Sequence, residues 1–184
     1  MQTYKDQVIF EKDEILKDDG KPYTVFTPYS RKWKATLTST ELDSYSCKKY
    51  HSNFFKHPES KIPSLKQLGF LESEIPFPSH NLQEELIKKY GKERDFPGIK
   101  GTSRLGVHLR FGTISIRQLA AKTKHLSETY LNELIWRDFY HMILWQFPHV
   151  GWGKSFKPAY DKIEWMKDSG EFEKWCTGQT GYPI

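Results

Sequence analysis

The feature that most constrains the fold is residues 127–147, where apolar side chains recur at helical spacing until Pro148. At about 100° per residue, one side of this segment carries Leu131, Leu134, Ile135, Phe139, Met142 and Gln146. Such a stripe predicts a helix that buries this side in a core. Proline has no backbone N–H and cannot continue a helix, so the helix is expected to end at Phe147.

The opposite side of this helix carries a second set of residues: Glu133, Trp136, Arg137, Tyr140 and Leu144. A solvent-facing side is ordinarily rich in Lys and Glu and lacks large aromatics, so this set needs another explanation. One interpretation is packing against another part of the fold, with Glu133 and Arg137 as an ion pair one turn apart. The other is a surface for a flat polar ligand such as a nucleobase. Trp136 and Tyr140 would then supply stacking faces, while Glu133 accepts hydrogen bonds. Arg137 would contact a phosphate.

Residues 101–104, Gly-Thr-Ser-Arg, open a segment that is expected to form a helix from Thr102 to Phe111. A helix start leaves backbone N–H groups unpaired and carries the positive end of the helix dipole. With two hydroxyls, a glycine and an arginine, this segment suits an anion such as phosphate. The alternative is an ordinary helix cap by Thr102 or Ser103. The segment is neither a Walker A loop nor a G-x-G-x-x-G turn.

Composition is that of a globular protein and excludes several classes. The chain has 184 residues, of which 37% are hydrophobic and 15% aromatic, which argues against disorder. A net charge of +5 suits a nucleic-acid partner without requiring one. Cys47 and Cys176 have neither disulfide-framework nor metal-type spacing, so no metal site is expected. No apolar run resembles a secretory signal or a membrane span, and a cytoplasmic location is expected.

The first part of the chain predicts little regular structure. Residues 8–10 and 23–26 are expected as strands, joined by a turn at residues 18–22. Residues 37–80 contain scattered prolines and histidines and are expected as a linker, with one helical turn at residues 65–68 before Gly69. Two strands cannot close a stable sheet, and the end of the chain is equally abrupt, so truncation is expected at both ends.

From residue 81 onward the pattern is helical. Apolar residues from 82 to 87 predict a helix that Gly91 ends in a left-handed cap. Ser115, with Gln118 three residues later, forms a capping box that starts another helix.

Several ordered motifs resemble those of the photolyase and cryptochrome family. They are Tyr90 with Arg94-Asp95-Phe96-Pro97, residues 101–105 (Gly-Thr-Ser-Arg-Leu), residues 109–115 (Leu-Arg-Phe-Gly-Thr-Ile-Ser) and residues 132–140 (Asn-Glu-Leu-Ile-Trp-Arg-Asp-Phe-Tyr). Trp175 with residues 178–184 is similar to the approach to the next motif, and residues 8–33 are similar to the last strands of the amino-terminal antenna domain. The match is colinear along essentially the whole chain.

The resemblance implies a mainly α fold, the first half of an all-helical FAD-binding domain preceded by the last strands of an α/β antenna domain. Residues 1–36 would end the antenna domain, residues 37–80 would be the interdomain linker, and residues 81–184 would form the truncated FAD-binding domain.

The resemblance also implies roles for individual residues. Those expected at the FAD cofactor are Tyr90, Thr102, Ser103, Arg104, Leu105, Gly106 and Tyr130. Those expected at DNA are Arg94, Glu133, Trp136, Arg137 and Tyr140. Glu133 and Trp136 would also act in catalysis, and Trp165 matches the outermost tryptophan of the electron-transfer chain that photoreduces FAD. The family usually has Ser where this chain has Gly106, so one hydroxyl is missing there.

The implied activity is that of a deoxyribodipyrimidine photolyase, in which excited reduced flavin passes an electron to a cyclobutane pyrimidine dimer in DNA and splits it. A second, antenna chromophore is implied for the parent protein, and its identity stays open. A monomer without membrane contact or protein partner is expected. The alternatives are a cryptochrome, a (6-4) photolyase, or a truncated fragment that binds DNA without catalysis. Glu133 with Trp136 favours the cyclobutane enzyme, and the fragment alone is expected to be inactive.

Overall fold

A computed structural model describes residues 4–44, 46–165 and 167–182 of the chain. Within these ranges the α-helices are α1 (Phe26–Thr36), α2 (Glu84–Glu93), α3 (Gly106–Phe111), α4 (Ile116–Thr123), α5 (Glu128–Gln146), α6 (Pro148–Gly151) and α7 (Ser169–Cys176). The short 3-10 helices are η1 (Thr40–Leu42), η2 (Lys48–Asn53) and η3 (Pro158–Lys162). β-Type pairing in the described ranges is limited to an isolated bridge between Leu16 and Pro22. The expected mainly α fold class is confirmed.

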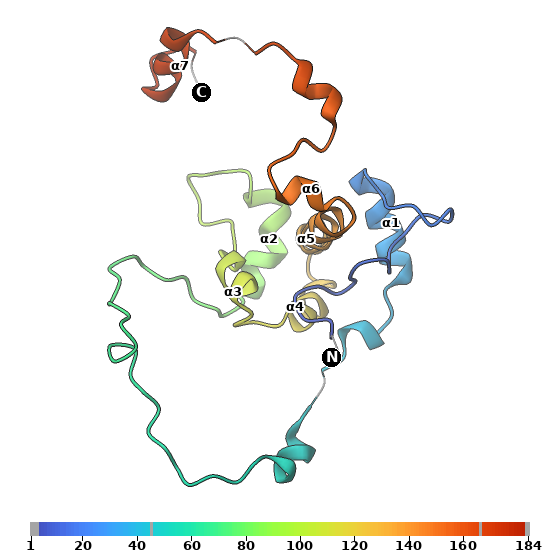
Figure 1. The fold of residues 1–184 in the computed structure, drawn as a ribbon, viewed down its shortest axis with the longest axis vertical. Coiled ribbons are helices and arrows are strands. Elements are labelled where there is room, and N and C mark those ends of the chain that lie inside the picture. The colour runs from blue at the N-terminus through green and yellow to red at the C-terminus, as the bar shows by residue number, and fades with distance from the viewer. Residues whose placement is uncertain (1–3, 45, 166, 183–184) are drawn as a thin grey trace. The chain divides into compact units, whose positions relative to one another are not determined.

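The chain divides by its contacts into two units, Met1–Gln146 and Phe147–Ile184. In the first unit α5 is central, because α1, α2 and α4 each pack against it (Figure 1). The buried residues of α5 are Tyr130, Leu131, Leu134, Ile135, Asp138, Phe139, Met142 and Ile143. The helix predicted for residues 127–147 is confirmed together with its apolar side, of which only Gln146 is half-buried.

The strands expected at residues 8–10 and 23–26 are not formed. Phe26 begins α1 instead, and α1 packs along α5. Phe26, Tyr29 and Trp33 recur at helical spacing, so that a helix places all of them on one side. Packing of that side against α5 outweighs the strand preference of individual aromatic and β-branched residues.

Residues 8–10 are buried, yet no strand within the described ranges pairs with them. The backbone N–H groups of Ile9 and Phe10 donate to the Asp138 carboxylate on α5 instead, each at 3.2 Å. The turn expected at residues 18–22 is confirmed, with Gly20 at φ 76°.

Two helix ends differ from expectation. α2 continues past Gly91 to Glu93. A Cβ atom at Gly91 would lie 3.1 Å from Thr129 Oγ1 on α5, so this glycine allows close helix packing instead of a cap. α3 begins at Gly106, four residues later than expected. Its end at Phe111 is as expected, with the next residue in the left-handed region at φ 66°.

One of the two hydrogen bonds of the capping box that opens α4 is confirmed, since Ser115 Oγ accepts from the backbone N–H of Gln118 at 3.4 Å.

Residues 54–77 are exposed throughout and contain no α-helix or strand. The expected turn before Gly69 is present, with Gly69 at φ 84°. The domain boundaries at residues 36 and 80 stay predictions.

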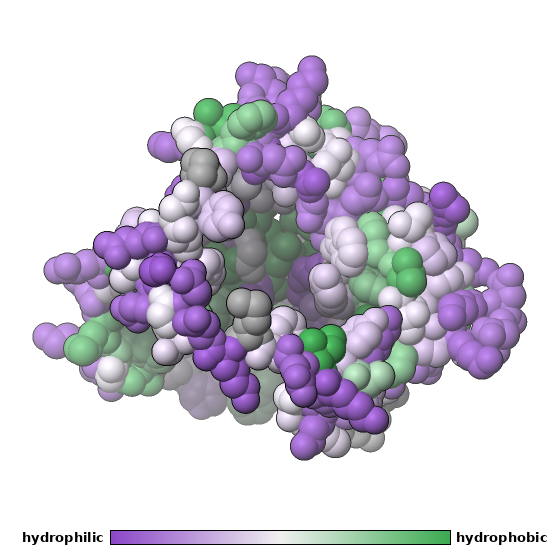
Figure 2. Space-filling model, turned by 90° about the horizontal axis from the view of Figure 1, so that it is seen from above, coloured by the Kyte–Doolittle hydropathy of each residue, from purple (hydrophilic) through white to green (hydrophobic). Residues whose placement is uncertain are grey.

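Hydrophilic residues cover most of the face shown in Figure 2, with hydrophobic residues in small groups between them. Across the described ranges, no helix combines the length and the apolar character that a membrane crossing requires.

The second unit contains α6, η3 and α7. Asp168 caps α7, since its Oδ1 accepts from the backbone N–H groups of Gly170 and Glu171 at 2.9 and 3.1 Å. The turns expected near Gly153 and Gly178 are confirmed, at φ 75° and 71°. The last two residues of the motif at 178–184 lie outside the described residues.

Candidate cofactor and nucleic-acid site

The loop between α2 and α3 passes very close to the end of α2. At Gly101 a Cβ atom would lie 2.5 Å from the carbonyl oxygen of Glu93, so only glycine fits there. Arg104 has φ 53°, a left-handed conformation that is uncommon for a residue with a side chain. Leu105 follows at φ −79°, ψ 0°. Alternating left- and right-handed residues occur in backbone turns that bind anions; here the Leu105 N–H donates to Ser103 Oγ at 3.5 Å.

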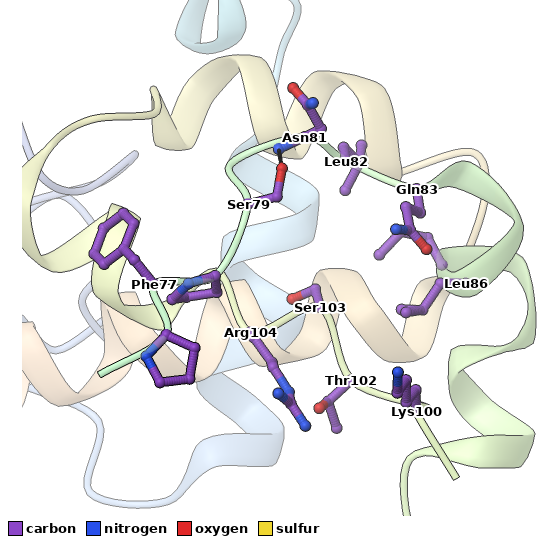
Figure 3. A pocket seen from close by; sticks show the side chains of 13 residues that line it. Phe77, Ser79, Asn81, Leu82, Gln83, Leu86, Lys100, Thr102, Ser103 and Arg104 are labelled. Atoms are coloured by element: carbon purple, nitrogen blue, oxygen red, sulfur yellow. Dashed lines mark hydrogen bonds between the residues drawn. The ribbon is translucent and has the colours of Figure 1, made fainter. Parts of the chain in front are cut away.

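A pocket of about 500 Å³ lies against this loop. It is lined by Pro76, Phe77, Pro78, Ser79, Asn81, Leu82, Gln83, Leu86, Ile87, Lys100, Thr102, Ser103 and Arg104. Figure 3 shows Lys100, Thr102 and Arg104 on the loop, with Gln83 and Leu86 across the space from them.

The lining of this pocket is suited to an anion. Lys100 and Arg104 supply positive charge, and the described lining contains no Asp or Glu. Hydroxyls of Thr102 and Ser103 and the amides of Asn81 and Gln83 add polar groups. α3 has only six residues, so its dipole is small, and the anion site expected at a helix start depends on the loop instead.

Three of the expected cofactor residues, Thr102, Ser103 and Arg104, line this pocket. Gly106 lines an adjoining pocket that shares Arg104. Leu105 is buried in the core at 2% exposure and is not among the described lining residues, and its backbone N–H donates to Ser103 Oγ at 3.5 Å.

The expected cofactor residues Tyr90 and Tyr130 are not among the described lining residues of the pocket. Tyr130 contacts the loop through Ser103, and Tyr90 packs against Tyr130. The Tyr130 hydroxyl lies 3.1 Å from Ser103 Oγ. Burial raises the pKa of the Tyr130 hydroxyl, which keeps it protonated. The Tyr90 ring packs edge-on against Tyr130, with ring centroids 5.0 Å apart.

The side of α5 that carries Glu133, Trp136 and Tyr140 is called its outer side. Trp136 lies there in a group of aromatic rings. Phe26 of α1 stacks on it face to face, with centroids 3.6 Å apart and an interplanar angle of 5°. Tyr140 lies beside it at 5.4 Å and 23°. Tyr140 is 56% exposed, whereas Trp136 is half-buried. This side is therefore part packed and part open. Packing is confirmed for Trp136, while a ligand surface at Tyr140 stays a prediction.

Two of the expected DNA contacts bind each other. The Arg94 guanidinium forms an ion pair with the Glu133 carboxylate, and it also lies over the Tyr90 ring. Burial acts against the charge of Arg94, but Glu133, Asp95 and Tyr90 together outweigh it, and the pKa of Arg94 is raised. Arg94, and not Arg137, is thus the ion partner of Glu133.

The Arg137 side chain forms hydrogen bonds with backbone carbonyl groups. Its guanidinium donates to the carbonyl oxygen of Gln7 and to that of Leu109 at 3.5 Å. Burial lowers the pKa of Arg137. These bonds tie the Arg137 guanidinium to the backbone of residues 7 and 109, which supports packing as a role of this side chain, while its phosphate contact stays a prediction.

Asp138 was not identified from sequence, although it is fully buried. Its Oδ2 accepts from Ile9, Phe10 and the Trp33 indole N–H, the last at 3.0 Å. Among the described residues, its Oδ1 has no hydrogen-bond partner. Burial raises the pKa of Asp138 to about 6, although the three donors act in the other direction.

Trp165 belongs to the second unit and is 75% exposed. It therefore lies at the surface of that unit, as expected, while its electron-transfer role stays a prediction.

Lys100, His108 and Phe26 were also missed. Lys100 lines the pocket, and its position directly before Gly101 was an available signal. His108 is buried and binds the Pro78 carbonyl and the Thr113 hydroxyl, each at 2.8 Å, which holds one wall of the pocket. No local pattern indicated the bond to Pro78, because Pro78 lies 30 positions from His108.

The chain is similar in sequence to a known protein family and to several proteins of known name. A family model described as the FAD binding domain of DNA photolyase matches residues 130–184. The chain is 34% identical to a deoxyribodipyrimidine photo-lyase of Synechococcus, over 97% of this chain and 42% of that protein. It is 28% identical to the corresponding enzyme of Escherichia coli, over 98% of this chain and 42% of that protein. The chain thus spans about two fifths of the length of these relatives.

A solved structure shows the same fold. The crystal structure of a bacterial class III photolyase from Agrobacterium tumefaciens is similar with a TM-score of 0.64 and 23% identity, and the match covers 96% of this chain and 41% of that one.

Proposed function

Because this chain belongs to the DNA photolyase family, we propose that it carries the phosphate-binding side of an FAD site and one DNA-binding helix of a deoxyribodipyrimidine photo-lyase. The observation that carries this proposal is the pocket beside residues 100–104, whose described lining has two cations, several hydroxyls and no acid. A dinucleotide cofactor with two phosphates matches that chemistry.

The residues of the pocket fit the phosphates of FAD. Lys100 and Arg104 would neutralise their charge. Thr102 and Ser103 offer hydroxyls for a phosphate or a ribose. When bound, FAD supplies light-driven electron transfer, while these residues bind and orient it.

The DNA-binding role rests on the outer side of α5. A cyclobutane dimer stacks poorly in a duplex, so flipping it out costs less than flipping a normal base. Trp136 and Tyr140 provide aromatic surface for such a base. Glu133 would accept hydrogen bonds from the base edges once Arg94 has turned to a phosphate. The proposed lesion is the cyclobutane pyrimidine dimer, and the proposed setting is the cytoplasm, without a protein partner.

The cofactor part is tested by titrating the chain with FAD and with riboflavin, which lacks phosphate, while flavin fluorescence anisotropy is measured. FAD is expected to bind and riboflavin is not. Arg104→Gln should weaken FAD binding, whereas Lys89→Gln, on the exposed part of α2, should not. Equal binding of FAD and riboflavin would contradict a phosphate site.

The DNA part is tested with single-stranded DNA that contains one thymine dimer and with the same DNA undamaged. The chain is expected to prefer the damaged strand. Trp136→Ala should cost about 1–3 kcal/mol of binding to the damaged strand, which is the range for loss of one stacked base, and much less on the undamaged strand. Equal losses on both strands would show that Trp136 serves only to pack the fold.

A further inference from the structure

Helix α1 is built to hold one side against α5. Trp33 is fully buried, and its indole N–H donates to Asp138 at 3.0 Å. One turn earlier, Tyr29 is also fully buried, and its ring packs against Phe139 at 5.1 Å. These two contacts fix how α1 lies along α5, and with it the position of Phe26 at the first turn of α1.

The Phe26 ring covers one face of Trp136. The two rings are nearly parallel, at 5°, and their centroids are 3.6 Å apart. Isolated aromatic pairs prefer offset or edge-on arrangements at about 4.5–7 Å. The closer face-to-face arrangement therefore depends on the anchoring of α1, and the spacing is close to that of stacked bases in DNA, about 3.4 Å. Phe26 occupies the place that a base would take on this face of Trp136.

The open end of the group lies at Tyr140. This ring is one turn further along α5, 5.4 Å from Trp136 and 23° from parallel. It is 56% exposed, whereas Phe26 and Trp136 are half-buried. A ligand therefore reaches the aromatic group from the Tyr140 end.

We infer that Phe26 is a positioning residue for base recognition. It closes one face of Trp136 and fixes the plane of the indole, so that a flipped-out pyrimidine contacts the aromatic group from the side of Tyr140. This inference rests on the proposed function, since it assigns the recognised group to a pyrimidine lesion. Phe26 touches Trp136 and acts through it.

The first measurement tests the stack without DNA. The chain is labelled with 5-fluorotryptophan, and the fluorine resonance of Trp136 is assigned from its loss in Trp136→Phe. A ring stacked face to face shifts this resonance upfield, so Phe26→Leu should move it downfield. Phe26→Tyr keeps the ring and should leave it in place. An unchanged resonance in Phe26→Leu would overturn the inference whatever the DNA result.

The second measurement compares binding to single-stranded DNA with and without a thymine dimer. Phe26→Leu should lower the preference for damaged DNA by about two- to tenfold, the range of an aromatic pair, with undamaged binding unchanged. Phe26→Tyr should restore the preference. The comparison variant is Tyr29→Leu, which loosens the same interface through Phe139 and should lower Tm. Because the Phe26 ring is still present in Tyr29→Leu, this variant should lose less of the preference than Phe26→Leu does.

The outcomes separate the two claims. A wild-type chain with no preference for damaged DNA contradicts the proposed function, and the fluorine measurement then still reports whether Phe26 fixes Trp136. A wild-type preference that Phe26→Leu leaves unchanged contradicts the inference alone. The same holds if Tyr29→Leu abolishes the preference as fully as Phe26→Leu, because general loosening of α1 would then explain both.

Discussion

Gly101 leaves no room for a side chain. A Cβ atom there would lie 2.5 Å from the carbonyl oxygen and 2.7 Å from the carbonyl carbon of Glu93, and backbone atoms cannot move aside as a flexible side chain can. Gly101→Ala should therefore displace the loop and cost about 1–3 kcal/mol of unfolding free energy in urea, as overpacking does. FAD binding should weaken as well.

The control for this prediction is Gly106→Ala, since nothing lies within 4 Å of a Cβ at Gly106. Alanine in the first turn of α3 should be neutral or stabilising by up to about 1 kcal/mol. Equal destabilisation by both substitutions would mean that the close approach at Gly101 is unimportant.

Asp138 makes stability depend on pH in an unusual direction. Burial raises its pKa to about 6, while an unfolded aspartate has a pKa near 3.9. The folded carboxyl thus binds its proton more strongly than the unfolded one, so its contribution to stability is largest below pH 4 and falls as the pH rises to about 6. A shift of two pKa units corresponds to about 3 kcal/mol.

Asp138→Asn has no proton to lose and should not show this fall. Urea unfolding of both chains at pH 4 and pH 7 measures the difference. The wild type should lose about 2 kcal/mol relative to the variant between these values, because the unfolded carboxyl is already half ionised at pH 4. A difference that is the same at both pH values would show that the Asp138 carboxyl titrates as an exposed one does.

At the scale of elements, the end of α2 meets the middle of α5 through Arg94 and Glu133. While the pair is closed, neither side chain is free for DNA. Glu133→Gln should therefore release Arg94 and tighten binding of undamaged single-stranded DNA by about two- to fivefold, the range for a half-exposed ion pair. In an Arg94→Gln background the same change should have little effect.

The control for the ion pair is Glu128→Gln. It removes the same charge from the same helix, but Glu128 pairs with Lys34 instead. The affinities are measured by fluorescence anisotropy at several salt concentrations, because phosphate contacts are salt-dependent. If Glu128→Gln tightens binding as much as Glu133→Gln, the gain comes from net charge and not from Arg94.

At the scale of the whole molecule, the proposed function assigns one side of a cofactor site to this chain. Its pocket offers groups for phosphates, and Phe77 is the only aromatic ring in the described lining. A flavin ring needs more aromatic and apolar surface than this for tight burial. The chain should therefore bind FAD reversibly and lose it on gel filtration, and it should not repair thymine dimers under blue light. A stoichiometric yellow protein after gel filtration would contradict this.

Local patterns were sufficient where the physical cause is itself local. The apolar period of α5 predicted its extent and its buried side, because helical geometry alone places those side chains together. Ser115 and Gly112 marked helix ends through bonds within one turn. The phosphate site predicted at residues 101–104 from their residue types stays a prediction, while the structure shows that Thr102, Ser103 and Arg104 line a pocket.

Tertiary structure decided what depends on residues distant in sequence. The Asp138 carboxylate accepts from the backbone N–H of Ile9, 129 positions away. Nothing near Asp138 in the sequence could indicate that it takes the hydrogen bond that a neighbouring strand was expected to accept. The same packing made Phe26 the start of a helix where its neighbours suggested a strand. The sequence by itself determined α5 and its buried side, the Ser115 cap of α4, the end of α3 at Phe111 and the residue types of the loop. Long-range packing decided which charged residues form ion pairs and which aromatic rings stack, as for Arg94 with Glu133 and Phe26 with Trp136. The physical reason is that these partners are distant in sequence, so the local pattern of residues does not indicate their contact.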